Sequence, residues 1–313
     1  MLQYLIILLD DTSVSYCHYE NTKTERKLIS LEDLKAGILF GMKENLMIQF
    51  VYPDYELPDV YKYAIETIDH TKIMPYSKAD EADIVIFEQW TELIHSALKG
   101  DYAYVIRTDK QSLFENYNLL KGKLVDIARL NIVITDIDSF TEDDFDQYKK
   151  VLSELSAMVE SAYEKEKFPQ INILTDRMML DKMNNCNAGW ENITLAPDGR
   201  FYVCPAFYFD DNGYSIGDLS SNLQLKNPQL YRLKYAPICR NCDAYQCKRC
   251  IWLNRKMTLE INTPSHEQCV VAHVERNASR NLLMGIRALG PFLPEIEIEE
   301  IDYLDPFDIK DRQ

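Results

Sequence analysis

Seven of the chain's eight cysteines fall in its C-terminal part, and their spacing could bind metal. They are Cys186, Cys204, Cys239, Cys242, Cys247, Cys250 and Cys269. The four central ones form the run C-x2-C-x4-C-x2-C, which reads CRNCDAYQCKRC. A C-x2-C pair on a tight turn can bring two thiolates to one metal ion, and two pairs can complete a tetrahedral site. The pattern is a strong signal for metal but a weak one for which metal.

The number of cysteines favours iron–sulfur clusters over one zinc ion. A single zinc ribbon would use about four cysteines and leave the others without a role. Two iron–sulfur clusters, which usually take about four cysteines each, would use all seven and leave one iron open to another ligand. Structural zinc stays the alternative on spacing alone. Disulfides are disfavoured because the number is odd and the chain reads as cytoplasmic.

Residues 1–180 alternate short apolar runs with longer amphipathic ones. The runs rich in Ile, Val, Tyr and Phe are predicted strands: Leu2–Leu9, Leu46–Val51, Ile84–Phe87, Tyr102–Ile106, Asn131–Ile134 and Ile171–Leu174. Predicted helices are Leu31–Met42 after a Ser30 cap, Leu57–Ile68 opened by Pro58, and Glu142–Lys167 after a Thr141 cap. Strands that alternate with helices predict an α/β fold with a parallel sheet.

The composition changes near Asn184, where the cysteines begin and loop residues become frequent. The segment NITLAPDGRFYVC predicts a hairpin that turns at Pro197–Gly199. Helical periodicity returns over Val271–Ile286, and the last residues are acidic and interrupted by proline. We therefore predict a β/α domain over 1–180, a cysteine-rich domain over 181–290 and an acidic tail over 291–313.

This cysteine pattern resembles the SPASM domain at the C-terminus of radical SAM peptide maturases. In that domain a Cys precedes a Gly, four residues and a second Cys, which here are Cys186, Gly199 and Cys204. A run of four cysteines and a last one follow, although the second and third spacers of this run are each one residue shorter than in the family. Gly217 and Asp218 match the family's I-G-D segment. The resemblance implies two 4Fe–4S clusters: one at Cys186, Cys204 and Cys250, the other at Cys239, Cys242, Cys247 and Cys269.

The N-terminal part resembles a degenerate radical SAM domain, a partial (β/α)6 barrel. SYCHYEN follows the first predicted strand, as the C-x3-C-x2-C motif does in that family, with Cys17 as its third cysteine. Asp10 and Val14 occupy the other two ligand positions, and a lone cysteine cannot hold the cluster that cleaves SAM. Residues 52–56, YPDYE, stand where the family carries Gly-Gly-Glu-Pro. The resemblance implies a retained barrel with no SAM-binding residues, and it assigns no catalytic residue.

The stretch LTDRMMLDKMNNCNAGW around Cys186 resembles the CXXX-repeat peptide maturases. This group implies an iron–sulfur protein that takes part in the maturation of a ribosomally made, Cys-repeat precursor peptide. We expect a peptide maturase rather than an active radical SAM enzyme. Two alternatives stay open: a non-catalytic scaffold that holds the peptide for a partner modifying enzyme, and a zinc-ribbon interaction module.

Charge and hydropathy exclude some partners. The balance of 34 basic and 50 acidic residues gives a net charge of −16, which argues against nucleic acid. The apolar N-terminal run is too short to span a bilayer, and no longer one follows, so we expect a cytoplasmic protein without a membrane partner. His266, in PSHEQC, is a candidate hydrogen-bond donor to a cluster sulfur, with an ordinary loop role equally open.

Overall fold

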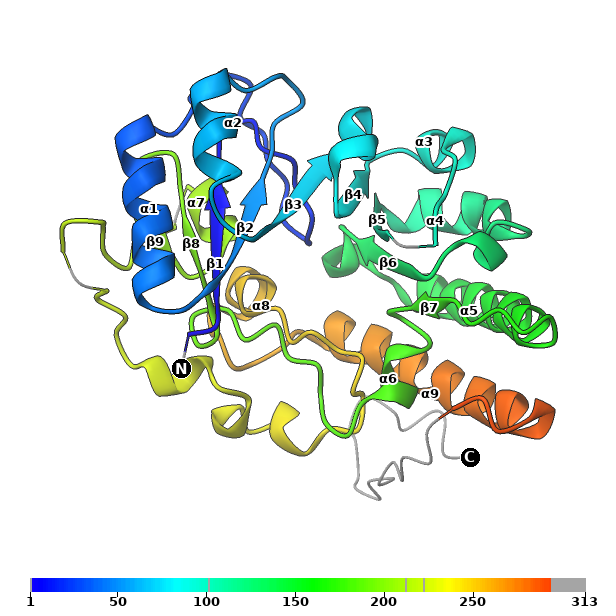
Figure 1. Ribbon diagram of the computed structural model, residues 1–313. Helices are drawn as coiled ribbons and strands as arrows, with labels where there is room; N and C mark the ends of the chain where they lie inside the picture. The colour runs from blue at the N-terminus through cyan, green and yellow to red at the C-terminus, as the bar shows by residue number, and fades with distance from the viewer. Residues whose placement is uncertain (1, 101, 212, 222, 294–313) are drawn as a thin grey trace. The chain divides into compact units, whose positions relative to one another are not determined.

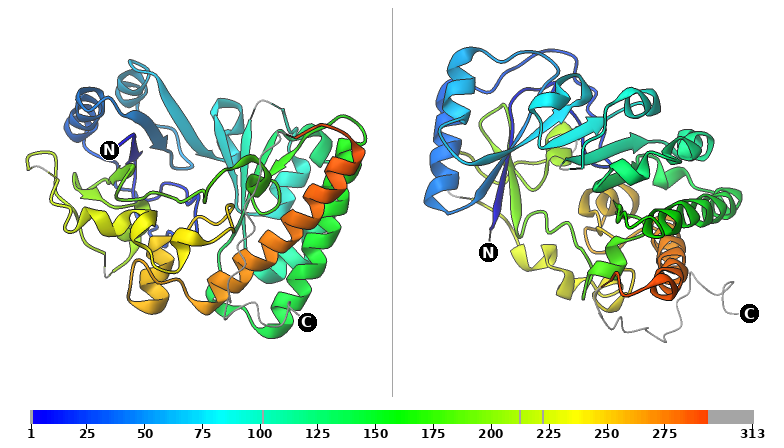
Figure 2. Two further views of the ribbon diagram at one scale, coloured as in Figure 1. Left: turned by 90° about the horizontal axis from the view of Figure 1, so that it is seen from below. Right: turned by 45° about the vertical axis from the view of Figure 1, so that its right-hand side comes forward.

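The computed structural model describes residues 2–100, 102–211, 213–221 and 223–293 (Figures 1 and 2). The chain divides into two compact units. Unit 1 comprises Met1–Ile86 and Asn187–Tyr235, and unit 2 comprises Phe87–Cys186 and Ala236–Gln313. The predicted domain boundaries near residues 180 and 290 stay a prediction, and most of the predicted tail, from residue 294 on, lies outside the described residues.

The strands are β1 (Tyr4–Leu8), β2 (Met47–Val51), β3 (His70–Pro75), β4 (Ile84–Phe87), β5 (Ala103–Thr108), β6 (Arg129–Ile134), β7 (Gln170–Ile171), β8 (Asn192–Leu195) and β9 (Phe201–Tyr202). The α-helices are α1 (Leu31–Lys43), α2 (Asp59–Ile65), α3 (Trp90–His95), α4 (Lys110–Asn116), α5 (Glu142–Tyr163), α6 (Asp176–Met179), α7 (Pro205–Phe209), α8 (Ile251–Thr258) and α9 (His266–Leu289).

Unit 1 contains a largely parallel sheet in the order β4-β3-β2-β1-β8-β9, in which only the β8–β9 pair is antiparallel. In the middle of this sheet Leu5 of β1 pairs with Ile48 of β2 and with Ile193 of β8. Helix α1 packs on β1 and β8 (Figure 1). Its Gly37 permits a close approach, because a Cβ at that position would lie 2.4 Å from Leu195. Successive residues of β1, Leu5 to Leu8, are all buried, so both faces of the sheet are covered here, which explains why β1 is a continuous apolar run.

In unit 2 the strands β5, β6 and β7 are parallel neighbours. The long helices α5 and α9 lie side by side (Figure 2). They run in the same direction, because Phe145 contacts His266 near their starts and Tyr163 contacts Phe292 just beyond the end of α9. Their apolar faces make up much of the core of this unit.

The predicted α/β fold with mostly parallel strands is confirmed. One strand was missed: β3 begins with the half-buried polar residues His70, Thr71 and Lys72, so its sequence shows no strand pattern. The predicted strand Ile171–Leu174 was too long, because the chain turns after Ile171, whose carbonyl accepts from the N–H groups of Leu174 and Thr175.

The predicted caps and hairpin are confirmed. Ser30 and Thr141 each accept a hydrogen bond from the backbone N–H three residues later, at the starts of α1 and α5. Helix α5 ends at Tyr163, before the predicted Lys167, and Glu166 adopts the left-handed region with φ +56°. The β8–β9 hairpin turns through Gly199, whose φ of +77° suits a residue without a side chain.

Candidate metal centre

Two cysteines of the central run accept a backbone hydrogen bond in the same way. The N–H of Ala244 donates to Sγ of Cys242 at 3.5 Å, and the N–H of Arg249 donates to Sγ of Cys247 at 3.4 Å. In each case the donor lies two residues after the cysteine, in the loop that leads from the 3₁₀ turn η7 (Cys239–Asn241) to α8. N–H groups directed at sulfur stabilise the thiolate, which is the form that binds metal.

The sulfurs of Cys239, Cys242 and Cys247 lie near one another. Burial raises the pKa of Cys239 to about 11, and the charge of Cys242 contributes to the rise. Burial also raises the pKa of Cys247, and the charges of Cys239 and Cys242 add to it. Gathering three thiolates, of which Cys239 is buried and Cys242 and Cys247 are half-buried, is unfavourable unless a cation accompanies them, and a bound metal deprotonates a coordinating thiol outright. This donor set therefore fits a thiolate-bound metal group.

A second pair of cysteines comes together in unit 2 from distant parts of the sequence. The backbone N–H of Cys186 donates to the carbonyl of Lys248 at 2.8 Å, which joins the segment around Cys186 to the central run. Burial raises the pKa of Cys250 to about 12, and the charge of Cys186 raises it further. Cys250 is the N-cap residue of α8, so N–H groups of the helix's first turn offset part of this rise.

A buried arginine lies among cysteines of both predicted sets. Burial lowers the pKa of the Arg249 guanidinium, whereas the charges of Cys239, Cys186, Cys247 and Cys250 raise it. Its Nε donates to Asn185 at 2.8 Å and one Nη donates to Asn262 at 2.7 Å. Its positive charge offsets the charge of these thiolates. We did not predict this residue; the only signal in the sequence is its place between two cysteines of the run.

A network of buried charges fixes the loop next to Cys242. Asp243 is 5 % exposed, and its carboxylate accepts from Arg177 at 3.3 Å and from Arg276 of α9 at 3.1 Å. Arg177 also donates to the backbone carbonyl of Asp243 at 2.9 Å. Because both the side chain and the backbone of this residue are held, the turn that carries Cys242 has one defined position.

Helix α9 brings two further candidate residues to unit 2. Cys269 lies buried in its first turn, and His273 lies one turn later, so the helical period places both on one face. Nε2 of His273 lies 3.6 Å from Sγ of Cys242. His266, the histidine to which the sequence pointed, begins the helix half-exposed, with its ring against Phe145.

The remaining predicted ligand, Cys204, lies in unit 1. Cys204 is the N-cap residue of α7 in unit 1, whereas the other predicted ligands belong to unit 2. Within the described ranges, no three His, Cys, Asp or Glu side chains already stand in the geometry of a metal site. The full ligand set therefore stays a prediction, supported by the paired N–H···S turns and by the gathered thiols.

The loop after β1 holds hydrogen-bonded carboxylates. Asp10 is 0 % exposed, and its carboxylate accepts from the N–H of Thr12 at 2.8 Å, from the Thr12 hydroxyl at 2.6 Å and from the Tyr55 hydroxyl at 2.8 Å. Val14 is buried, and Cys17 is half-buried. Tyr55 belongs to the YPDYE segment after β2, so this segment and the β1 loop are joined through Asp10.

The neighbouring Asp11 makes a second polar cluster in unit 1. It accepts a hydrogen bond from the hydroxyl of Tyr208 in α7 and pairs with Nζ of Lys23 at 3.3 Å. The same ammonium lies 3.7 Å from the centre of the Tyr208 ring, a cation–π arrangement. The β1 loop is thus tied to α7 by charge and by ring contact.

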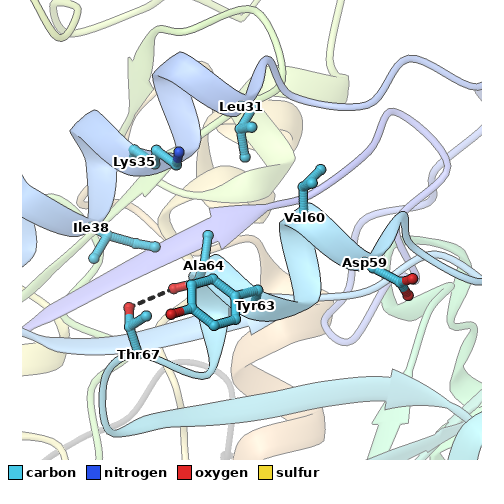
Figure 3. A pocket seen from close by; sticks show the side chains of 8 residues that line it. All are labelled: Leu31, Lys35, Ile38, Asp59, Val60, Tyr63, Ala64 and Thr67. Atoms are coloured by element: carbon cyan, nitrogen blue, oxygen red, sulfur yellow. Dashed lines mark hydrogen bonds between the residues drawn. The ribbon is translucent and has the colours of Figure 1, made fainter.

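Unit 1 also has an apolar groove of about 480 Å³ between α1 and α2 (Figure 3). Its lining residues are Leu31, Lys35, Ile38, Asp59, Val60, Tyr63, Ala64 and Thr67. None of them is a predicted metal ligand, so the groove is separate from the cysteine sites.

The chain has a radical-SAM-like α/β fold. It is similar to anSMEcpe, an anaerobic sulfatase-maturating enzyme, solved with bound AdoMet: the TM-score is 0.64 at 12 % identity, over 92 % of this chain and 96 % of the other. A structure of anSMEcpe with AdoMet and the Kp18Cys peptide gives 0.63 at 12 % identity, over 91 % and 99 %. A third, with the Cp18Cys peptide, gives 0.62 at 12 %, over 92 % and 100 %. At this identity the likeness concerns the fold.

The sequence itself matches no family model and no curated protein. Among the described helices, none has both the length and the apolar character needed to cross a membrane.

Proposed function

We propose that this chain is an iron–sulfur protein that takes part in the maturation of a ribosomally synthesised Cys-repeat peptide, without a SAM-cleaving cluster of its own. Cys186, Cys204 and Cys250 would hold one 4Fe–4S cluster, and Cys239, Cys242, Cys247 and Cys269 the other. The observation that carries the proposal is the pair of N–H···S turns at Cys242 and Cys247, in a loop where neighbouring sulfurs gather.

The β1 loop supports the absence of a SAM-cleaving cluster. Asp10 replaces a thiol at the first ligand position, and its carboxylate already accepts hydrogen bonds from Thr12 and Tyr55. Val14 offers no ligand atom at the second. With Cys17 as the one thiol of the motif, the loop lacks the thiolates that such a cluster needs.

A peptide partner agrees with the fold. The structurally similar anSMEcpe was solved with bound peptides, and the fold shared over most of both chains supports a peptide as partner here. A cluster held by three thiolates has an iron that could take a thiolate of the peptide, and coordination would lower the pKa of that thiol. The role of this chain's residues would be to hold that cluster and to position the peptide beside it.

Metal analysis of protein purified without oxygen tests the cofactor. We expect a brown protein with about eight irons and about eight sulfides per chain, and the EPR signal of reduced 4Fe–4S clusters. A colourless protein that carries zinc instead would contradict the proposal and support the zinc-ribbon alternative.

Mass spectrometry of a precursor peptide tests the activity. The protein loaded with its clusters is incubated with a Cys-repeat precursor peptide, a reductant and, separately, candidate partner enzymes. A mass change with this chain alone supports a maturase. Peptide binding without any mass change until a partner enzyme is added would favour the scaffold alternative. No binding at all would contradict both.

A further inference from the structure

A ring nitrogen of His273 contacts a predicted cluster ligand. The side chain is 4 % exposed, on the face of α9 that also carries Cys269, and its Nε2 lies 3.6 Å from Sγ of Cys242. The backbone N–H of Ala244 approaches the same sulfur at 3.5 Å. A ring nitrogen and a backbone N–H therefore converge on one sulfur.

The distance allows two arrangements once metal is present. A sulfur and a nitrogen bound to one tetrahedral ion, at about 2.3 and 2.0 Å, lie about 3.5 Å apart, so His273 and Cys242 could share a zinc ion. In a 4Fe–4S cluster each iron takes one protein ligand, so ligands on different irons lie farther apart than that. With Cys242 bound to such a cluster, 3.6 Å is instead an N–H···S contact.

We infer that His273 donates a hydrogen bond from Nε2 to the cluster-bound sulfur of Cys242 and raises the reduction potential of the cluster held by Cys239, Cys242, Cys247 and Cys269. The inference rests on the proposed function, since it needs that cluster. A metal-bound thiolate can only accept, so Nε2 carries the proton. Reduction adds one electron to the cluster, and a donor on its sulfur stabilises the added negative charge.

The surroundings of His273 keep this donor in place. Gln246 of the cysteine loop donates to the carbonyl of Ala272, the residue of α9 directly before His273, at 2.7 Å, which ties the helix to the loop. Arg276 holds Asp243 beside Cys242 from the same helix. Helix and loop are thus joined on both sides of the histidine, so the N–H···S contact does not depend on a mobile side chain.

Three variants test the inference in the anaerobic holoprotein. His273→Leu removes the donor, and His273→Gln keeps an N–H near the position of Nε2. His95→Gln is the matched control, because that ring bonds to Thr91 of its own helix. EPR-monitored redox titration should show a more negative midpoint for His273→Leu, a smaller shift for His273→Gln and none for the control, with iron content unchanged throughout.

Other results overturn the inference in distinct ways. An unchanged midpoint in His273→Leu, with the clusters intact, rejects the hydrogen bond but not the proposed function. Loss of metal in both His273 variants assigns the residue as a ligand instead. Wild-type protein without iron rejects the proposed function itself.

A measurement on the wild-type protein keeps the inference testable if His273→Leu does not fold. Pulsed EPR of protein labelled with ¹⁵N-histidine should show a nitrogen coupling much weaker than that of a ligating nitrogen. A coupling as strong as that of a ligand, or no histidine coupling at all, would contradict the proposed hydrogen bond.

Discussion

The hydroxyl of Tyr148 in α5 donates a 2.8 Å hydrogen bond to the buried carboxyl of Glu275 in α9. Gln246, next to Cys247, donates to the other oxygen of the same carboxyl at 3.3 Å. One side chain thus connects the two long helices of unit 2 with the cysteine loop. Burial raises the pKa of Glu275 to about 7, although both hydrogen bonds lower it.

Glu275 makes stability depend on pH. Because the pKa of Glu275 in the folded state lies above the ordinary value of 4.5, the folded state binds more protons than the unfolded state between pH 4.5 and about 7. The free energy of unfolding therefore falls as the pH rises through this window, by about 3 kcal/mol in all. Glu275→Gln removes this loss, so the variant should be more stable than the wild type at pH 8 and similar to it below pH 4.5.

Urea denaturation at several pH values measures this effect. Glu164→Gln, at the exposed end of α5, is the control that removes a carboxyl without burial. A wild-type stability that stays flat across the window, or an equal pH response in Glu275→Gln, would refute the assignment.

The bond between Tyr55 and Asp10 should contribute to the stability of unit 1. Tyr55→Phe removes one donor from a fully buried carboxylate, and we expect the free energy of unfolding to fall by about 1–2 kcal/mol. Tyr63→Phe, whose ring is 78 % exposed, should leave it unchanged. Denaturation of both variants side by side tests this prediction. Equal changes in the free energy of unfolding would mean that the hydrogen bond contributes nothing.

Single cysteine variants should divide the iron between two sites. Cys247→Ser should lose about four of about eight irons, and Cys186→Ser should lose the other four, because each change removes a ligand from a different cluster. Cys17→Ser should keep all of them. Iron and sulfide assays on freshly purified protein give the numbers. A loss of iron in Cys17→Ser would instead make Cys17 a further ligand.

Arg249 should be needed for stability as well as for charge balance. Arg249→Met leaves the buried Asn185 and the half-buried Asn262 without their donor and should cost on the order of 3 kcal/mol. Arg240→Met is the control, since Arg240 lies exposed in the same run of cysteines. Thermal denaturation without oxygen compares the two, and a similar small shift in both would show that Arg249 is dispensable.

Local sequence was sufficient for elements whose signals lie within a few residues. Ser30 and Thr141 were correctly predicted as caps, because an N-cap bonds to a group three residues away. The hairpin at Gly199 was predicted for the same reason. Strand β3 was missed because packing between β2 and β4, rather than its own pattern, makes it a strand.

The spacing of the cysteines by itself determined that this part of the chain carries a metal-binding pattern, since C-x2-C is a local relation. Tertiary structure alone decided that His273 meets Cys242, that Arg249 lies near Cys186 and Cys239 and that Tyr55 bonds to Asp10. These partners are far apart in the sequence or lie on different elements. Their distances are set by the packing of helix against loop and of strand beside strand. The spacing of residues along the chain does not show this packing.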